Sequence, residues 1–179
     1  DFIARSIIKN GELKQLIDVD GVRGVTSNPA IFEKAITSSS DYDADIAELS
    51  DKTDDNEEIF FGVAIKDIQA AADLFKGVYD ESKGEDGYVS LEVSPFLALD
   101  TEGTIKQAAE LWKKVDRKNV MIKITGTKPG LEAIRQSTAK GININVTLLF
   151  GLPRYEEVAE AYIAGLEDHL AAGHSIAHI

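Results

Sequence analysis

Lys123 is the residue of this chain whose type and setting could do covalent chemistry, because it lies within the apolar run at residues 120–124. A neutral lysine amine adds to a ketone to form an imine, which withdraws electrons and allows a neighbouring carbon–carbon bond to break. An exposed lysine has a pKa of about 10.4 and is almost entirely charged at pH 7, whereas burial favours the neutral amine. The alternative is a lysine that protects an exposed strand edge or extends to water.

Three other short segments carry polar side chains at the spacing of β-strands. Successive side chains of a strand point to opposite faces, so each of these segments has one apolar and one polar face. The polar positions are Thr26, Asn28, Ser90, Glu92, Ser94, Asn143, Asn145 and Thr147. A solvated sheet face usually carries lysine, arginine, glutamate and threonine, whereas these positions carry small hydroxyls, amides and one acid. The pattern therefore predicts an enclosed polar pocket that also contains Lys123.

The elements that must position these residues alternate between strand and helix. Apolar residues at helical spacing predict helices near residues 11–18, 59–79, 104–115, 129–141 and 155–170. Strands and helices that alternate with short connections indicate a parallel α/β fold. Polar side chains facing inward on several strands favour a closed (β/α)₈ barrel over an open sheet, whose faces are normally both covered by apolar helices. The chain also lacks the GxGxxG and GxxxxGK[ST] motifs that would favour a nucleotide-binding sheet.

Composition limits the compartment and the partners. The chain has 179 residues, of which 44% are hydrophobic and 28% charged, as in ordinary globular proteins. The absence of cysteine and of an apolar run of about 20 residues predicts a cytoplasmic protein without a disulfide framework or a membrane partner. A net charge of −12 disfavours binding to nucleic acid.

Neither of two metal-like patterns predicts a metal site. The acidic stretch at residues 41–58 begins like a calcium loop, but Ile46 replaces the required glycine and Lys52 the final glutamate. It is interpreted as a solvated helix and loop. Three histidines lie near the end of the chain, at His169, His174 and His178. Their spacing fits no zinc site, so we expect neither a metal nor a cofactor.

Four segments, taken in order, carry a family resemblance: GVTSNPAIFEKAI, VSLEVSP, VMIKITGTKPGLEAIRQ and GININVTLLFG. They resemble the transaldolases, in particular the bacterial type that is also found fused to phosphoglucose isomerase, and the resemblance covers essentially the whole chain. It implies a cofactor-independent class I aldolase on a (β/α)₈ TIM barrel. Such a transferase of the pentose phosphate pathway moves a dihydroxyacetone unit from fructose 6-phosphate or sedoheptulose 7-phosphate to an aldose phosphate.

The same resemblance assigns catalytic roles. Lys123 is expected to form the Schiff base with the ketose. Glu92 is expected to work with Thr147 to hold the water used in imine chemistry, although a buried ion pair with Lys123 would also explain this glutamate. Asp1 matches the family aspartate that takes the proton from the C4 hydroxyl during cleavage. An acid and a base of this kind are what such a reaction requires.

Substrate binding is expected from four further residues. Asn28 and Asn145 match the family asparagines that hydrogen-bond the hydroxyls of the dihydroxyacetone unit, and Thr26 and Ser90 are expected to line the same pocket. An SNP tripeptide after a strand is also a common turn, so Asn28 has a simple structural alternative.

The extent of the chain leads to a further expectation. A complete barrel needs about 250 residues. Residues 1–179 are therefore predicted to form a partial barrel that lacks most of the first strand and the sixth to eighth strands, with the phosphate-binding residues elsewhere. On its own it would have little or no activity. A Schiff-base lyase similar to fructose 6-phosphate aldolase and a non-catalytic barrel fragment stay open as alternatives, and the oligomeric state is not indicated.

Overall fold

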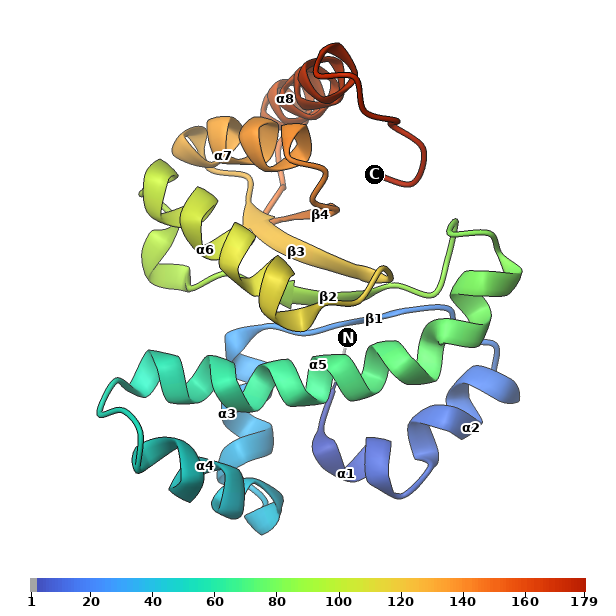
Figure 1. The fold of residues 1–179 in the computed structure, drawn as a ribbon, viewed down its shortest axis with the longest axis vertical. Helices are drawn as coiled ribbons and strands as arrows, with labels where there is room; N and C mark the ends of the chain where they lie inside the picture. Colours follow the sequence, from blue (N-terminus) through green and yellow to red (C-terminus); the bar gives the residue numbers. More distant parts are fainter. Residues whose placement is uncertain (1–2) are drawn as a thin grey trace. The chain divides into compact units, whose positions relative to one another are not determined.

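The computed structural model describes residues 3–179, in which strands and helices alternate (Figure 1). The described strands are β1 (Val25–Thr26), β2 (Val89–Glu92), β3 (Val120–Thr125) and β4 (Ile144–Thr147). They follow one another in the sheet in chain order, β1-β2-β3-β4, with helices in every connection. This is the repeating strand–helix unit of a (β/α)₈ barrel, present in part, so the predicted fold class is confirmed.

The helices of the described residues are α1 (Arg5–Lys9), α2 (Glu12–Asp18), α3 (Pro29–Thr37), α4 (Asp43–Ser50), α5 (Asn56–Glu81), α6 (Thr101–Val115), α7 (Lys128–Ala139) and α8 (Leu152–Ala171). Short 3₁₀ turns occupy Ser40–Tyr42 and Pro95–Leu97. The five predicted helices are present, and the acidic stretch contains α4 as interpreted. Helices α1 and α3 were not predicted.

Contacts between Cα atoms divide the chain into two compact units, which are described separately. The first unit comprises Asp1–Val89 with Val115–Asn119, and the second comprises Ser90–Lys114 with Val120–Ile179.

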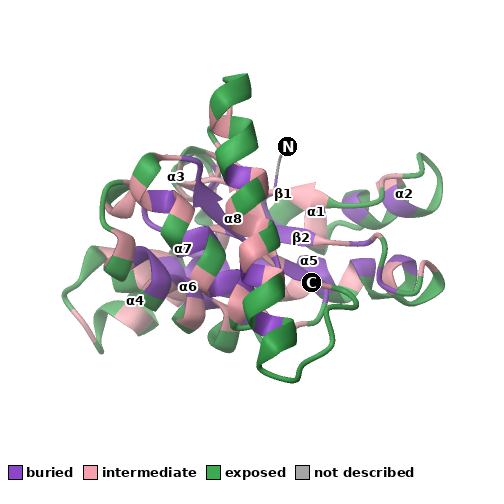
Figure 2. Cartoon of the chain, turned by 90° about the horizontal axis from the view of Figure 1, so that it is seen from above, coloured by how far each residue is buried: buried purple, intermediate pink, exposed green. Residues whose placement is uncertain are grey.

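Helix α5 supplies most of the core of the first unit. Asp55 caps its start by accepting hydrogen bonds from the backbone N–H groups of Glu57 and Glu58. Its inward face is fully buried at Val63, Ala64, Ile68, Ala71, Ala72 and Phe75, and this burial is visible as the purple face of α5 in Figure 2. Val63 of this helix forms a side cluster with Ala4, just before α1, Ala35 of α3 and Tyr42 of the 3₁₀ turn before α4.

Gly87 lies after α5 and lets the chain turn towards Val89, the first residue of β2 and the last of this stretch of the first unit. Its φ of +83° is left-handed, and a Cβ at this position would lie 2.5 Å from the backbone nitrogen of Tyr79. The Gly87 N–H donates to the carbonyl of Arg23 at 2.8 Å, and Val25 N–H donates to the carbonyl of Tyr88 at 3.0 Å. These bonds hold β1 beside the start of β2, so only glycine satisfies the turn here.

Strand β3 is the central element of the second unit. Val120, Ile122 and Ile124 are completely buried, as the alternating pattern predicted. The strand pairs in parallel with β4, with Lys123 opposite Asn145 and Thr125 opposite Thr147. On its other side, the N–H of Val93 donates to the carbonyl of Lys123 at 3.1 Å, directly after β2. Lys123 is therefore held by backbone hydrogen bonds in the middle of the sheet.

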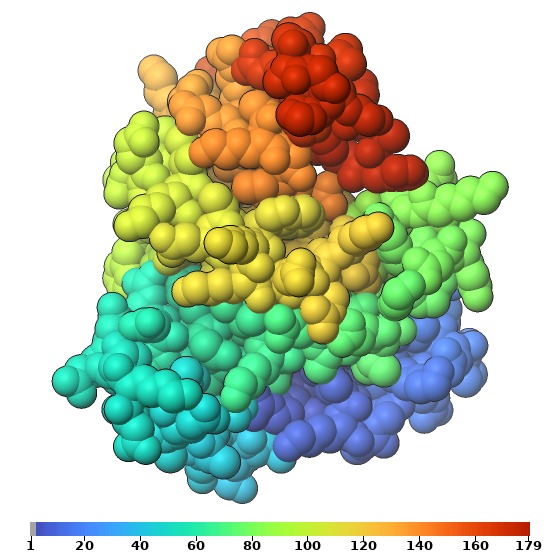
Figure 3. All heavy atoms as spheres, viewed as in Figure 1, coloured from blue at the N-terminus to red at the C-terminus, as the bar shows by residue number. Residues whose placement is uncertain are grey.

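Helices α7 and α8 pack closely against each other in the second unit, and their atoms adjoin in the space-filling view (Figure 3). The close approach occurs at Gly165 of α8, where a Cβ would lie 2.6 Å from the carbonyl oxygen of Arg135. An ion pair at 2.8 Å between Arg135 and Asp168 bridges the same helices.

Candidate active site

Lys123 lies in the middle of β3 with its side chain almost buried. Its Nζ is 3.3 Å from Oε2 of Glu92, the last residue of β2, and the two side chains are 9% and 12% exposed. The apolar neighbours Ile122 and Ile124 point to the opposite face and into the core. The amine thus stands on the polar face of the strand beside a carboxylate, as the sequence pattern predicted.

This pair can support imine chemistry. Proton transfer in catalysis needs donor and acceptor within hydrogen-bond distance or one water apart, and 3.3 Å meets that requirement. A carboxylate beside the amine can accept a proton from the attacking nitrogen and return it to the departing hydroxyl of the carbinolamine. The ion-pair interpretation of Glu92 and the catalytic one are therefore compatible.

Asn145 is brought beside Lys123 by the register of β3 and β4. Paired residues of neighbouring strands point to the same face, so the Asn145 amide shares the polar face with the lysine. The Asn145 Nδ2 donates to Oγ of Ser90 at 3.0 Å. This hydrogen bond uses one of the two amide hydrogens of Asn145. Because Ser90 belongs to β2, the bond spans β3 and fixes the orientation of the Asn145 side chain.

Thr147 lies two residues beyond Asn145 and ends the strand. Its carbonyl accepts a hydrogen bond from the N–H of Gly126 at 2.8 Å, which fixes the ends of β3 and β4 together. The next residue, Leu148, has φ +57° and is 59% exposed, so the chain turns away from the strand directly after Thr147. Leucine rarely adopts this left-handed backbone, so the sequence carried no sign of the turn. The predicted role of Thr147 in holding water with Glu92 stays a prediction.

Thr26 and Asn28 belong to the first unit, and Asp1 lies outside the described residues. The Asn28 Oδ1 accepts a hydrogen bond from the N–H of Ile31 at 2.8 Å and caps α3, whose first residue is Pro29. The side chains of Thr26 and Asn28 are partly buried. Their roles in substrate binding stay predictions, and Asn28 has a structural task in addition.

Ser94 and Thr125 are polar side chains of the second unit to which the family resemblance assigned no catalytic or binding role. They are only 3% and 6% exposed. Ser94 follows β2 on the same parity as Ser90 and Glu92, and its N–H donates to Oε1 of Gln107 at 2.6 Å. Strand parity placed Ser94 on the polar face, and the same parity extends to Thr125, two residues beyond Lys123.

His169, the first of the three histidines near the end of the chain, is buried and used in packing. The Nδ1 of His169 lies 2.9 Å from the carbonyl oxygen of Ala139, and its ring lies 4.8 Å from that of His174. Among residues 3–179, no three histidine, cysteine, aspartate or glutamate side chains are grouped to hold a metal ion. Within the same described range, no helix has the length and apolar character needed to cross a membrane.

Comparison with known proteins places these features in a family. A profile of the family described as Transaldolase/Fructose-6-phosphate aldolase matches residues 1–177. The chain is 49% identical over 176 residues to a protein named Transaldolase from Trichodesmium erythraeum, covering 98% of this chain and 46% of that protein. It is 47% identical over 179 residues to Transaldolase from Mycobacterium tuberculosis, covering 100% of this chain and 48% of the relative.

A third relative, Transaldolase 2 of Nostoc punctiforme, is 46% identical over 179 residues, which make up 100% of this chain and 47% of that protein. The chain thus spans about half the length of the curated relatives it matches. With the profile matching nearly every residue, the chain belongs to the transaldolase/fructose-6-phosphate aldolase family.

Proposed function

We propose that the protein is a transaldolase in which Lys123 forms a Schiff base with a ketose phosphate such as fructose 6-phosphate or sedoheptulose 7-phosphate. The observation that carries the proposal is the nearly buried Lys123–Glu92 pair, with Nζ and Oε2 3.3 Å apart. The family to which the chain belongs supports it. A cytoplasmic location, sugar-phosphate substrates and a barrel present only in part belong to the same proposal.

Each step of the reaction has a residue in this scheme. The neutral amine of Lys123 adds to the C2 carbonyl of the ketose, and the carbinolamine loses water with proton transfer through Glu92 and a water held with Thr147. Asp1 then takes the C4 hydroxyl proton, the C3–C4 bond breaks, and an aldose phosphate leaves. The bonding electrons remain as an enamine on Lys123, which attacks the carbonyl of the acceptor aldose phosphate. Hydrolysis of the new imine returns the lysine.

The dihydroxyacetone unit has to stay bound between the two half-reactions. Asn28 and Asn145 are proposed to hydrogen-bond its hydroxyls, with Thr26 and Ser90 beside them. The hydrogen bond at 3.0 Å between Asn145 and Ser90 supports the proposed role of these two residues, because it fixes the orientation of the Asn145 amide before substrate arrives.

A second candidate function is that of a lyase that releases free dihydroxyacetone. The family description, which includes fructose-6-phosphate aldolase, favours it as the alternative. Assays with and without an acceptor aldose separate the two, since a transaldolase turns over fructose 6-phosphate only when an acceptor is present.

The test of the proposal is borohydride reduction of the whole protein in the presence of fructose 6-phosphate, followed by peptide mass spectrometry. We expect a reduced three-carbon adduct on Lys123 and no adduct in Lys123→Ala. Lys128→Ala is the matched control, because Lys128 is an exposed lysine of the same unit, and it should keep the adduct. A correctly folded wild-type protein without any adduct on Lys123 would refute the Schiff-base mechanism.

A further inference from the structure

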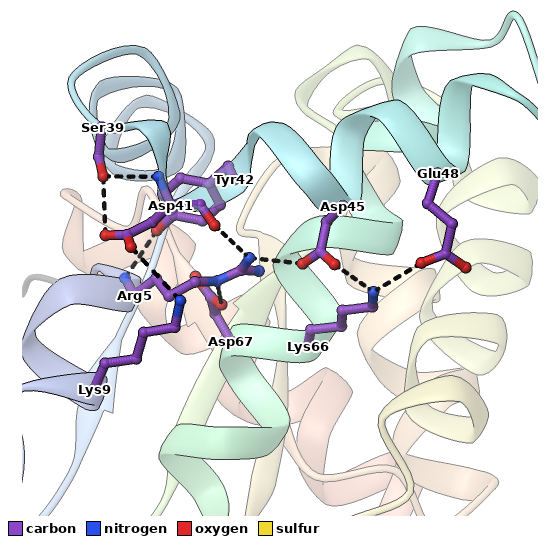
Figure 4. Close-up of polar contacts among 9 residues, drawn as sticks. All are labelled: Arg5, Lys9, Ser39, Asp41, Tyr42, Asp45, Glu48, Lys66 and Asp67. Atoms are coloured by element: carbon purple, nitrogen blue, oxygen red, sulfur yellow. Dashed lines mark hydrogen bonds and ion pairs between the residues drawn. The ribbon is translucent and has the colours of Figure 1, made fainter.

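Buried polar groups to which the proposed reaction gives no role occur in both units. Around Arg5 in the first unit, such groups bond to one another (Figure 4). The Nε of Arg5 donates to Oδ1 of Asp67 at 2.8 Å, and its backbone N–H donates to the hydroxyl of Tyr42 at 2.8 Å. These contacts join α1 to α5 and to the turn before α4, so the structure itself explains the group. The buried hydroxyl of Thr125 in the second unit lacks such an explanation.

Thr125 is the last residue of β3 and lies on the same face of the strand as Lys123. Its side chain is only 6% exposed. No hydrogen bond joins its hydroxyl to another of residues 3–179. A buried hydroxyl without a protein partner is uncommon and costs stability. On the polar face of the lysine strand, a bound substrate would supply the missing partner.

The backbone holds Thr125 in a fixed place. A Cβ on Gly130, in the first turn of α7, would lie 2.1 Å from the carbonyl oxygen of Thr125, so the helix packs directly against this end of the strand. The next residue, Gly126, donates its N–H to the carbonyl of Thr147 on β4 at 2.8 Å. A side chain that is held in this way is suited to recognition, because little order has to be gained on binding.

The direction of the strands indicates which part of the substrate Thr125 meets. Substrates of (β/α)₈ barrels bind at the carboxyl ends of the strands. The proposed ligands of the dihydroxyacetone unit are Asn145, which is paired with Lys123, and Ser90, which lies nearer the amino end of β2. The remaining carbons of the ketose therefore extend towards the carboxyl ends. Thr125 lies two residues beyond Lys123 in that direction, or about 6.6 Å along the strand.

We propose that Thr125 is a specificity-determining residue whose hydroxyl binds the hydroxyl next to the carbonyl carbon of the exchanged aldose phosphate. The inference rests on the proposed function, in which Lys123 carries the dihydroxyacetone unit. In the ketose, the group in question is the C5 hydroxyl. The C4 oxygen loses its proton during cleavage, so the C5 hydroxyl is the first that stays unchanged and can serve recognition alone. The threonine hydroxyl both donates and accepts, as a sugar hydroxyl does.

Thr147 is paired with Thr125 across the two strands, and the proposed reaction gives it the catalytic water. The two threonines of this row thus have separate tasks. Loss of the Thr125 hydroxyl should weaken recognition of the aldose and leave formation of the imine on Lys123 intact.

Two substitutions in the whole protein separate the hydroxyl of Thr125 from its bulk. Thr125→Val replaces the hydroxyl by a methyl group of similar volume, whereas Thr125→Ser keeps the hydroxyl and removes the methyl group. The matched control is Thr138→Val in α7 of the same unit. Thr138 is 0% exposed, and its Oγ1 has no hydrogen-bond partner within residues 3–179, so this change also removes a buried hydroxyl.

The measurement is the kcat/KM for two acceptors with fructose 6-phosphate as donor. One acceptor is glyceraldehyde 3-phosphate, and the other is 3-oxopropyl phosphate, which lacks only the hydroxyl next to the carbonyl. Because the dihydroxyacetone unit is already bound to the enzyme when the acceptor arrives, the acceptor kcat/KM reports the second half-reaction alone.

Thr125→Val should lower the kcat/KM for glyceraldehyde 3-phosphate about tenfold or more, because a site built to bind a hydroxyl discriminates strongly by it. The value for 3-oxopropyl phosphate should change by less than about twofold, since that acceptor offers no hydroxyl to lose. Thr125→Ser and Thr138→Val should keep the wild-type ratio between the two acceptors. Borohydride reduction should still trap an adduct on Lys123 in all three variants.

The outcomes separate this inference from the proposed function. Absence of any adduct on wild-type Lys123, or turnover of fructose 6-phosphate without an acceptor, contradicts the proposed function itself. When the wild type forms the adduct and needs the acceptor, three results overturn the role of Thr125. These are an equal fall for both acceptors in Thr125→Val, no fall for either, and a wild type that does not distinguish the two acceptors. Should Thr125→Val not fold, Thr125→Ala provides the same comparison, because it only removes atoms.

Discussion

Asn28 is a residue with two tasks that mutation can separate. Its Oδ1 caps α3 by accepting from the Ile31 N–H, and its amide hydrogens are the part that the proposed function directs to substrate. Aspartate keeps the capping oxygen and lacks the amide donor, whereas alanine lacks both.

We therefore expect Asn28→Asp to fold as stably as wild type while its kcat/KM falls. Asn28→Ala should lose catalysis and also about 1 kcal/mol of stability, the usual cost of a lost helix cap. Denaturant unfolding and steady-state kinetics of the two variants provide the comparison. Full activity in Asn28→Asp would show that Asn28 is a cap only.

Tyr42 makes the free energy of unfolding depend on pH in the alkaline range. Burial raises the pKa of its hydroxyl to about 12, whereas in the unfolded chain it titrates near the ordinary value of about 10. Between these values the folded protein keeps a proton that the unfolded chain has lost, so stability falls as pH rises through this window. Below about pH 10 the stabilisation linked to the Tyr42 proton is fully present.

The loss should be on the order of 2 kcal/mol by pH 12, because one pKa unit corresponds to about 1.4 kcal/mol. Unfolding by urea at a series of pH values from 9 to 12 measures it. Tyr42→Phe should show a shallower decline across the same range. Identical slopes for the two proteins would mean that Tyr42 ionises as readily in the fold as in the unfolded chain.

At the scale of elements, the contact of α7 with α8 depends on Gly165. A Cβ there would meet the Arg135 carbonyl at 2.6 Å and the Thr138 Cβ at 2.7 Å, and neither is the flexible end of a side chain. Gly165→Ala should force the helices apart and destabilise the second unit by roughly 1–3 kcal/mol.

Gly77→Ala in α5 is the matched control, because nothing lies within 4 Å of a Cβ at that helical position. It should be neutral or stabilising by up to about 1 kcal/mol, as expected for alanine in place of glycine in a helix. Thermal unfolding of both variants decides between these expectations, and equal melting temperatures would contradict the close-contact argument.

The elements were predictable to different degrees, for reasons that lie in their residues. Helix α5 could be predicted because its buried residues recur at helical spacing over many turns. Helix α1 could not, since it has five residues and its start depends on the hydroxyl of Tyr42, far along the chain. The start of α3 at Asn28 and Pro29 could be taken for a simple turn, although a capping residue followed by proline equally begins a helix.

At the scale of the whole molecule, the fold class was predictable because alternation of polar and apolar side chains recurs in β2, β3 and β4. The same alternation placed Lys123, Glu92, Ser90 and Asn145 on one face, and the structure brings them into contact as two pairs. What periodicity could not provide was the pairing itself, because hydrogen bonds between strands depend on register and not on the composition of either strand. Thr26 and Asn28, in the other unit, are joined to the site only by the family resemblance.

The register of β3 against β4 restricts the length of β4 much more than the length of the loop that follows it. Loss or gain of one residue within β4 would replace Asn145, opposite Lys123, with Ile144 or Val146, and turn the amide away from the lysine. The segment after Thr147 begins with the exposed Leu148 and includes Phe150, which is 91% exposed. Length variation among natural or engineered descendants can therefore accumulate after Thr147 while β4 itself stays invariant in length, so this exposed segment can change without turning Asn145 away from Lys123.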